Sequence, residues 1–131
     1  MPGPADAPPP ASAPLVLLVE DSDLITSALR ILFEETGRRV AIAASVAAAV
    51  AACRAEAPAL MLLDLSLPDG DGLRVLDAVR GTGAAPRVAV AMTGHDDDAT
   101  RARCLAAGCA DVLYKPVPTR ELLARAGQWL R

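Results

Sequence analysis

Carboxylate, hydroxyl and ammonium side chains follow four separate apolar runs of the sequence. Glu20 and Asp21 follow residues 15–19, Asp64 follows residues 60–63, Thr93 follows residues 88–92, and Lys115 follows residues 112–114. Each run has the length and composition of a buried strand. Because ligands of an open parallel sheet bind at the carboxyl ends of its strands, we expect these side chains to meet in one crevice.

The residue types in this set favour the chemistry of a cation and a phosphoryl group. Carboxylates bind a hard cation such as Mg²⁺. A lysine and a hydroxyl suit the oxygens of a phosphoryl group. A carboxylate that remains free, for which Asp64 is our candidate, can act as the nucleophile that becomes phosphorylated.

The elements that must position these residues alternate along the chain. Strands are predicted at residues 15–20, 39–43, 59–64, 87–92 and 110–114. Helices are predicted from a cap at Ser22 or Asp23 to Gly37, from a cap at Ser45 to just before Pro58, and over 72–80, 96–108 and 119–130. For the first helix, the pattern predicts an apolar face of Leu24, Ala28, Leu29 and Leu32. Five such βα units predict an α/β fold, a (βα)5 doubly wound parallel five-stranded sheet with helices on both faces.

Composition excludes several classes of protein. The 131 residues fit one domain, and 53% are hydrophobic with only one Phe, one Tyr and one Trp, which predicts an aliphatic core. A net charge of −3 provides no basic surface, so we expect no direct nucleic-acid binding. Residues 40–53, the longest uncharged apolar stretch, are too few and too rich in alanine to span a membrane. No secretory signal pattern is present, and a cytoplasmic location is expected.

Two further features concern the ends and the thiols of the chain. Residues 1–14 contain six of the eleven prolines, which predicts a disordered Pro/Ala-rich tail before a domain at 15–131. Cys53, Cys104 and Cys109 lack C-x-x-C spacing and are expected to be buried or half-buried free thiols.

Four motifs together resemble the receiver domain of two-component response regulators. They are Leu17-Leu18-Val19-Glu20-Asp21, Leu63-Asp64-Leu65-Ser66-Leu67-Pro68-Asp69-Gly70-Asp71-Gly72, Met92-Thr93-Gly94 and Lys115-Pro116. The resemblance covers approximately residues 15–131, and it rests on all four motifs in the right order and at the right intervals. It implies a flavodoxin-like sheet with strand order 2-1-3-4-5.

The resemblance also implies a role for each residue. Asp64 is the phosphoacceptor, and a histidine kinase or phosphotransfer protein supplies the phosphoryl group. Mg²⁺ is held by Glu20, Asp21, Asp64 and the backbone carbonyl of Ser66. Thr93 and Lys115 contact the phosphoryl oxygens, and a cis bond to Pro116 directs the lysine into the crevice.

Some roles remain open within the resemblance. His95 either overlooks the site or is an exposed loop residue. A downstream protein is expected to bind the face formed by the helix at 96–108, the strand at 110–114 and the helix at 119–130. Receivers usually carry Tyr or Phe three residues before the lysine, where this chain has Val112, and Tyr114 lies on the same side of the strand but nearer the site.

Three other functions compete with phosphoacceptance, which itself implies no enzyme. An aspartate-nucleophile phosphatase needs a second aspartate two residues after the nucleophile, where Ser66 stands. A flavin carrier needs a hydroxyl- and glycine-rich phosphate loop, where Glu20 and Asp21 would repel phosphate. The third alternative is a receiver-like docking module that binds its partner constitutively. The absence of the usual aromatic residue at Val112 favours it, and the complete set of acids, threonine and lysine argues against it. The chain is either a stand-alone regulator or a receiver from a longer protein.

Overall fold

Five parallel strands form the central sheet of this computed structural model, which describes residues 9–131. They are β1 (Leu15–Val19), β2 (Arg39–Ala43), β3 (Leu60–Asp64), β6 (Val88–Thr93) and β7 (Asp111–Tyr114). Their spatial order is β2-β1-β3-β6-β7. Numbered among the five predicted strands, this is the order 2-1-3-4-5, so the predicted fold class is confirmed.

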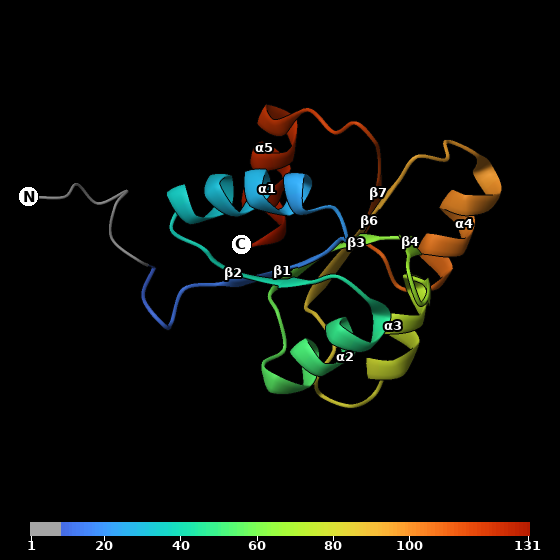
Figure 1. Cartoon of the computed structure of the whole chain (residues 1–131), viewed down its shortest axis with the longest axis horizontal. Helices are drawn as coiled ribbons and strands as arrows, with labels where there is room; N and C mark the ends of the chain where they lie inside the picture. Colours follow the sequence, from blue (N-terminus) through green and yellow to red (C-terminus); the bar gives the residue numbers. More distant parts are fainter. Residues whose placement is uncertain (1–8) are drawn as a thin grey trace, which may run out of the picture.

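Five helices cover the two faces of the sheet (Figure 1). They are α1 (Asp23–Glu35), α2 (Val46–Ala55), α3 (Leu73–Val79), α4 (Asp98–Ala106) and α5 (Thr119–Trp129). Helices α1 and α5 lie on one face of the sheet, while α2 and α3 lie on the other (Figure 1). The loops that lead from the strands into the helices leave from the carboxyl ends of the strands.

Two hydrophobic clusters fill the spaces between the sheet and its helices. Successive strand residues point to opposite faces, so Leu62 belongs to the cluster under α1 and α5, and Leu63 to the cluster under α2 and α3. Strand β3 is buried along its whole length, as expected for the centre of a parallel sheet. A rigid central strand therefore carries Asp64 at its end.

A short hairpin between β3 and α3 was not predicted. Its strands, β4 (Ser66–Leu67) and β5 (Gly70–Asp71), pair antiparallel. Each has two residues, which is too short for a periodic pattern to be visible in the sequence. The hairpin begins two residues after Asp64 and therefore belongs to the surroundings of the predicted site.

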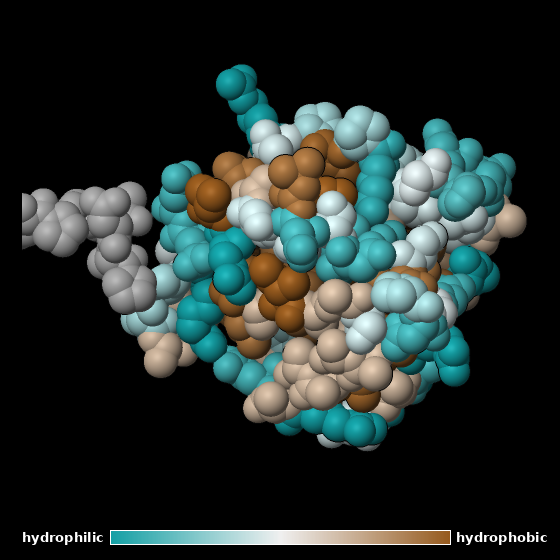
Figure 2. Space-filling model, viewed as in Figure 1, coloured by the Kyte–Doolittle hydropathy of each residue, from teal (hydrophilic) through white to brown (hydrophobic). Residues whose placement is uncertain are grey.

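The predicted apolar face of α1 is partly wrong. Ser22 caps the helix, since its Oγ accepts a hydrogen bond from the Ile25 N–H, but the buried positions are Thr26, Leu29 and Phe33. Leu24 is 83% exposed, and Ala28 is exposed as well. Hydrophobic atoms are accordingly visible on the surface over α1 (Figure 2). The observed face includes Phe33, whose large ring is fully buried in the cluster beneath α1 and α5.

The start of the chain and the thiols complete the fold. Of the predicted tail, residues 1–8 lie outside the described residues, while Ala13 is buried and closes a turn by donating its N–H to the Pro10 carbonyl, 2.9 Å away. The three cysteines are buried free thiols, as predicted. Within residues 9–131, none of the helices has both the length and the apolar character needed to cross a bilayer.

Candidate functional site

The strand register places the predicted site residues at one edge of the sheet. Val19 lies beside Leu63, so Glu20, which follows β1, lies level with Asp64, the last residue of the neighbouring β3. Thr93 is the last residue of β6, the other neighbour of β3, and it pairs with Tyr114, directly before Lys115. The predicted side chains therefore lie together at the carboxyl ends of the strands.

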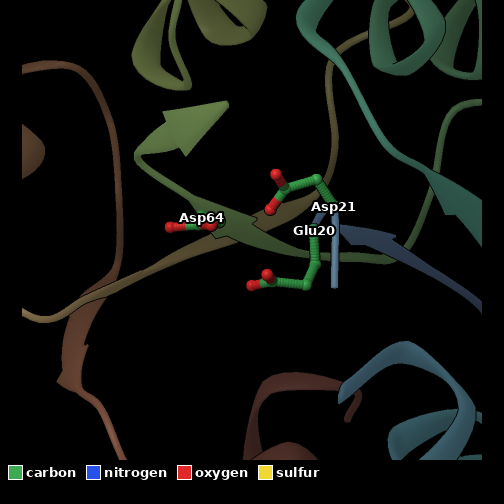
Figure 3. A group of neighbouring side chains, drawn as sticks. All are labelled: Glu20, Asp21 and Asp64. Atoms are coloured by element: carbon green, nitrogen blue, oxygen red, sulfur yellow. The ribbon is translucent and has the colours of Figure 1, made fainter. Parts of the chain in front are cut away.

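Three carboxylates gather in this crevice. Oxygen atoms of Glu20, Asp21 and Asp64 all lie within 4.8 Å of one another. All three side chains extend toward the same side from the ends of β1 and β3 (Figure 3). Glu20 is 3% and Asp64 is 6% exposed, whereas Asp21 is exposed. Carboxylates buried so close together repel one another unless positive charge or hydrogen bonds compensate them.

Lys115 supplies part of that compensation. Its Nζ lies 2.8 Å from Glu20 Oε2 and 3.3 Å from Asp64 Oδ2. Desolvation by burial lowers the pKa of Lys115, but the hydrogen bond that its ammonium donates to Glu20 and the charge of Asp64 outweigh this effect, so the pKa lies above its usual value. The lysine is therefore a cation held between the two buried acids. The bond between Lys115 and Pro116 is cis, as the resemblance implies.

Backbone N–H groups hold the acids as well. Ser22 donates its N–H to Glu20 Oε1 at 3.2 Å, and Ser66 donates its N–H to Asp64 Oδ1 at 3.2 Å. The Glu20 N–H in turn donates to the Ala43 carbonyl, 3.0 Å away on the end of β2. These bonds fix the acids by the local course of the chain after each strand.

Thr93 is buried at the end of β6, with 2% of its surface exposed. Its Oγ1 accepts a hydrogen bond from the His95 N–H at 3.0 Å, and its carbonyl accepts one from the Lys115 N–H at 2.8 Å. The threonine is thus connected through the backbone to the lysine. His95 itself is exposed in the loop before α4.

Gly72 allows the chain to turn tightly beneath Asp64. A Cβ added at this position would lie 2.1 Å from the Asp64 carbonyl oxygen, far inside contact distance. The Gly72 N–H donates to the Leu65 carbonyl at 2.9 Å. The last glycine of the Pro-Asp-Gly-Asp-Gly turn is therefore required by the close approach of α3 to the end of β3.

Receivers usually have an aromatic residue at the position that Val112 occupies in this chain, and Val112 is a core residue. Val112 is buried in the cluster beneath α2 and α3, and Tyr114 is partly buried against the same cluster. Tyr114 pairs directly with Thr93 across the strands, so both side chains lie on one face. The ring is thus next to the threonine.

Two acids of the turn after Asp64 have contacts that the sequence did not reveal. The Asp69 carboxylate accepts hydrogen bonds from the backbone of α2, and Asp71 accepts one from the Leu73 N–H and pairs with Arg103 of α4. Aspartates in a turn are typical capping residues, which is the signal that could have suggested these contacts. Their partners on α2 and α4 are distant in sequence and were not predictable from spacing.

The donor set fits a hard divalent cation. Three carboxylates and one ammonium give the crevice a net negative charge, and all the candidate ligand atoms are oxygens. Mg²⁺ prefers oxygen ligands and retains several waters, so few protein groups are needed. Glu20, Asp21 and Asp64 are therefore suited to hold it.

Known proteins share this fold and sequence pattern. The response regulator receiver domain family matches residues 16–127. The transcriptional regulatory protein AfsQ1 of Streptomyces coelicolor is 37% identical over 118 residues, which cover 90% of this chain and 52% of that protein. The KDP operon transcriptional regulatory protein KdpE of Escherichia coli is 34% identical over 116 residues, which cover 88% and 51%. The chain thus spans about half the length of these relatives. That it does not bind nucleic acid directly stays a prediction, because these relatives are transcriptional regulators.

Solved structures show the same similarity. The CheY-like receiver domain from Methanospirillum hungatei superimposes with a TM-score of 0.82 at 28% identity, covering 91% of this chain and 94% of that one. The receiver domain of the sensor histidine kinase PA1611 from Pseudomonas aeruginosa has a TM-score of 0.79 at 27% identity, with 91% and 98% covered, and holds a magnesium ion in its active site cleft. With the family match extending from β1 into α5, this chain belongs to the response regulator receiver domains.

Proposed function

We propose that this receiver domain accepts a phosphoryl group on Asp64 from the phosphohistidine of a histidine kinase or phosphotransfer protein, in a reaction that depends on Mg²⁺. The observation that carries the proposal is the position of Asp64. It is a buried carboxylate at the end of the central strand, with two further acids and one lysine around it.

The proposed transfer is an in-line displacement at phosphorus. A carboxylate oxygen of Asp64 forms the new O–P bond, the P–N bond breaks, and its electron pair stays on the imidazole nitrogen of the donor. Lys115, held 3.3 Å from Asp64 Oδ2, is placed to neutralise the phosphoryl oxygens as they arrive. The Thr93 hydroxyl lies at the adjacent strand end and donates to a second phosphoryl oxygen. Glu20, Asp21, Asp64 and the Ser66 carbonyl would hold Mg²⁺, which would supply further charge neutralisation when bound.

A protein donor has apolar surface available beside the crevice. A cavity of about 410 Å³ lies between α1 and the start of α5, and Lys115 forms part of its wall. Ile25, Ala28, Pro116 and Val117 also line it. A helix of the donor that packs here would bring its phosphohistidine to the mouth of the crevice, which supports a protein donor.

The phosphorylated domain would act through the face formed by α4, β7 and α5. An Asp111 oxygen of β7 lies 2.5 Å from Arg125 Nη1 of α5, and the other lies 4.0 Å from Arg101 Nη1 of α4, so one partly exposed charge network joins the three elements. We propose that a downstream protein recognises this face. Exposed ion pairs are weak, so a modest shift of α4 can rearrange them.

Labelling with a small phosphodonor tests the proposal. Acetyl phosphate with Mg²⁺ should add one phosphoryl group to the intact protein, and EDTA should prevent the addition. Absence of labelling under both conditions would contradict phosphoacceptance and favour the alternative of a constitutive docking module.

A further inference from the structure

Asp69 connects the β4–β5 hairpin to the start of α2. It lies in the turn between β4 and β5, and its carboxylate accepts hydrogen bonds from the Val46 N–H at 2.7 Å and the Ala47 N–H at 3.1 Å. These N–H groups belong to the first turn of α2, where they have no partner within the helix. The bonds from Val46 and Ala47 lower the pKa of Asp69, so the link is between an ionised carboxylate and the backbone.

One end of this link leads to Ser66. Ser66 pairs with Asp71 in the hairpin, and its N–H donates to Asp64 Oδ1 at 3.2 Å. The turn that contains Asp69 closes this hairpin. A shift of the turn would therefore be transmitted to the backbone of Ser66, whose carbonyl is a proposed metal ligand.

The other end of the link leads to Glu20. Helix α2 follows β2 after a two-residue connection, and the last residue of β2, Ala43, accepts a hydrogen bond from the Glu20 N–H at 3.0 Å. Asp69 thus joins the hairpin after β3 to the β1–β2 side of the crevice. This connection is additional to the direct pairing of β1 with β3.

We propose that Asp69 is a positioning residue for the metal site: it fixes the distance between Ser66 on one side and Glu20 and Asp21 on the other. The inference rests on the proposed function, because it concerns the same Mg²⁺ ligands. Groups that orient metal ligands change metal affinity by about 10–100-fold when removed.

Ser45 offers a matched control at the same helix end. Its Oγ accepts a hydrogen bond from the Ala48 N–H at 3.1 Å, so it also caps α2. Unlike Asp69, it makes this bond within its own segment and does not reach the hairpin. Loss of Ser45 should therefore weaken the start of α2 and leave the connection to Ser66 intact.

The experiment compares Asp69→Ala, Asp69→Asn and Ser45→Ala with the wild type, without any phosphodonor. Mg²⁺ is titrated while backbone amides are followed by NMR, and unfolding in urea reports the stability of each variant. Asp69→Ala should bind Mg²⁺ about tenfold more weakly. Asp69→Asn keeps one side-chain oxygen as an acceptor and should lie between Asp69→Ala and the wild type. Ser45→Ala should lose stability and keep wild-type affinity.

The metal-free spectra give a second readout. The amides of Ser66 and Glu20 should shift in Asp69→Ala and stay unchanged in Ser45→Ala. Wild-type Mg²⁺ affinity in Asp69→Ala, or equal weakening in Ser45→Ala, would overturn the inference and leave the proposed function intact. A wild type that binds no Mg²⁺ would instead contradict the proposed function. Unchanged shifts of the Ser66 and Glu20 amides in Asp69→Ala would contradict the positioning role of Asp69 alone.

Discussion

Glu20 and Asp21 are neighbours in the sequence but differ in their surroundings. Glu20 is buried and hydrogen-bonded to Lys115, whereas Asp21 is exposed at the rim of the crevice. Either acid can contribute an oxygen to a cation. Without a cation, however, Glu20 stabilises the lysine, and Asp21 mainly adds negative charge to a crowded site.

This difference predicts opposite effects on the metal-free protein. Glu20→Gln should lower the free energy of unfolding by about 1 kcal/mol, because Lys115 loses a charged partner. Asp21→Asn should raise it slightly, because one repelling charge is removed. Urea unfolding in EDTA measures both values. Both variants should bind Mg²⁺ at least about tenfold more weakly than the wild type. Wild-type Mg²⁺ affinity in both variants would show that Glu20 and Asp21 are not metal ligands.

Substitution by alanine should change the stability of the protein in opposite directions at Gly72 and at Gly127. Gly72→Ala should destabilise the protein by about 3 kcal/mol, because the new Cβ overlaps the Asp64 carbonyl. Gly127 lies within α5 and has no atom within 4 Å of the added Cβ, so Gly127→Ala should stabilise by up to about 1 kcal/mol. Thermal unfolding compares them, and equal effects would argue against a close approach at Gly72.

At the scale of elements, the end of β7 differs from the usual receiver pattern. Val112 is part of the core, so no large ring at that position can follow Thr93 when the site is phosphorylated. The residue beside Thr93 is Tyr114, which is only partly buried. After the buried Thr93, residues 94–98, which lead into the start of α4, are exposed. We therefore expect conformational change to concentrate there.

Substitution of Tyr114 tests this expectation. Tyr114→Ala should reduce binding to a downstream partner more than it reduces the rate of labelling by acetyl phosphate. The ring lies beside Thr93, whereas β6 separates the strand of Tyr114 from the strand of Asp64. Structures with and without beryllofluoride, a mimic of the phosphoryl group, provide the second measurement. A large shift at Val112 with an unchanged loop over residues 93–98 would show the idea to be wrong.

At the scale of the whole molecule, cation binding should be visible as added stability. The crevice brings carboxylates of β1 and β3 together, and a ligand that binds only the folded state stabilises it. At Mg²⁺ concentrations about 100 times the dissociation constant, the gain should be about 2.7 kcal/mol. Thermal unfolding with Mg²⁺ and with EDTA measures it, and Asp64→Asn serves as a control in which the gain is smaller. An unfolding temperature that does not respond to Mg²⁺ would argue against the site.

Much of the architecture was predictable because it depends on local patterns. Short apolar runs with polar residues at their ends defined the strands and placed Glu20, Asp64, Thr93 and Lys115 at one edge of the sheet. Ser45 was identified as a cap because capping depends on residues close in sequence. The strand order came from the resemblance, since the sequence pattern alone does not choose among arrangements of parallel strands.

The parts that were missed depend on contacts between distant segments. Leu24 fits an apolar helical face, but the burial of Phe33 rotates that face away from it. Asp69 and Asp71 look like ordinary turn residues, and only the folded chain brings them to α2 and α4. The geometry around the site therefore depends on tertiary contacts that no local pattern contains.

The central claim is that Asp64 is the residue that carries the phosphoryl group. The most direct test is to label the protein with acetyl phosphate and Mg²⁺, reduce the acyl phosphate with borohydride, and locate the modified residue by mass spectrometry of peptides. We predict a single modification at Asp64, and no labelling of Asp64→Asn. Modification of another residue, or undiminished labelling of Asp64→Asn, would contradict the account.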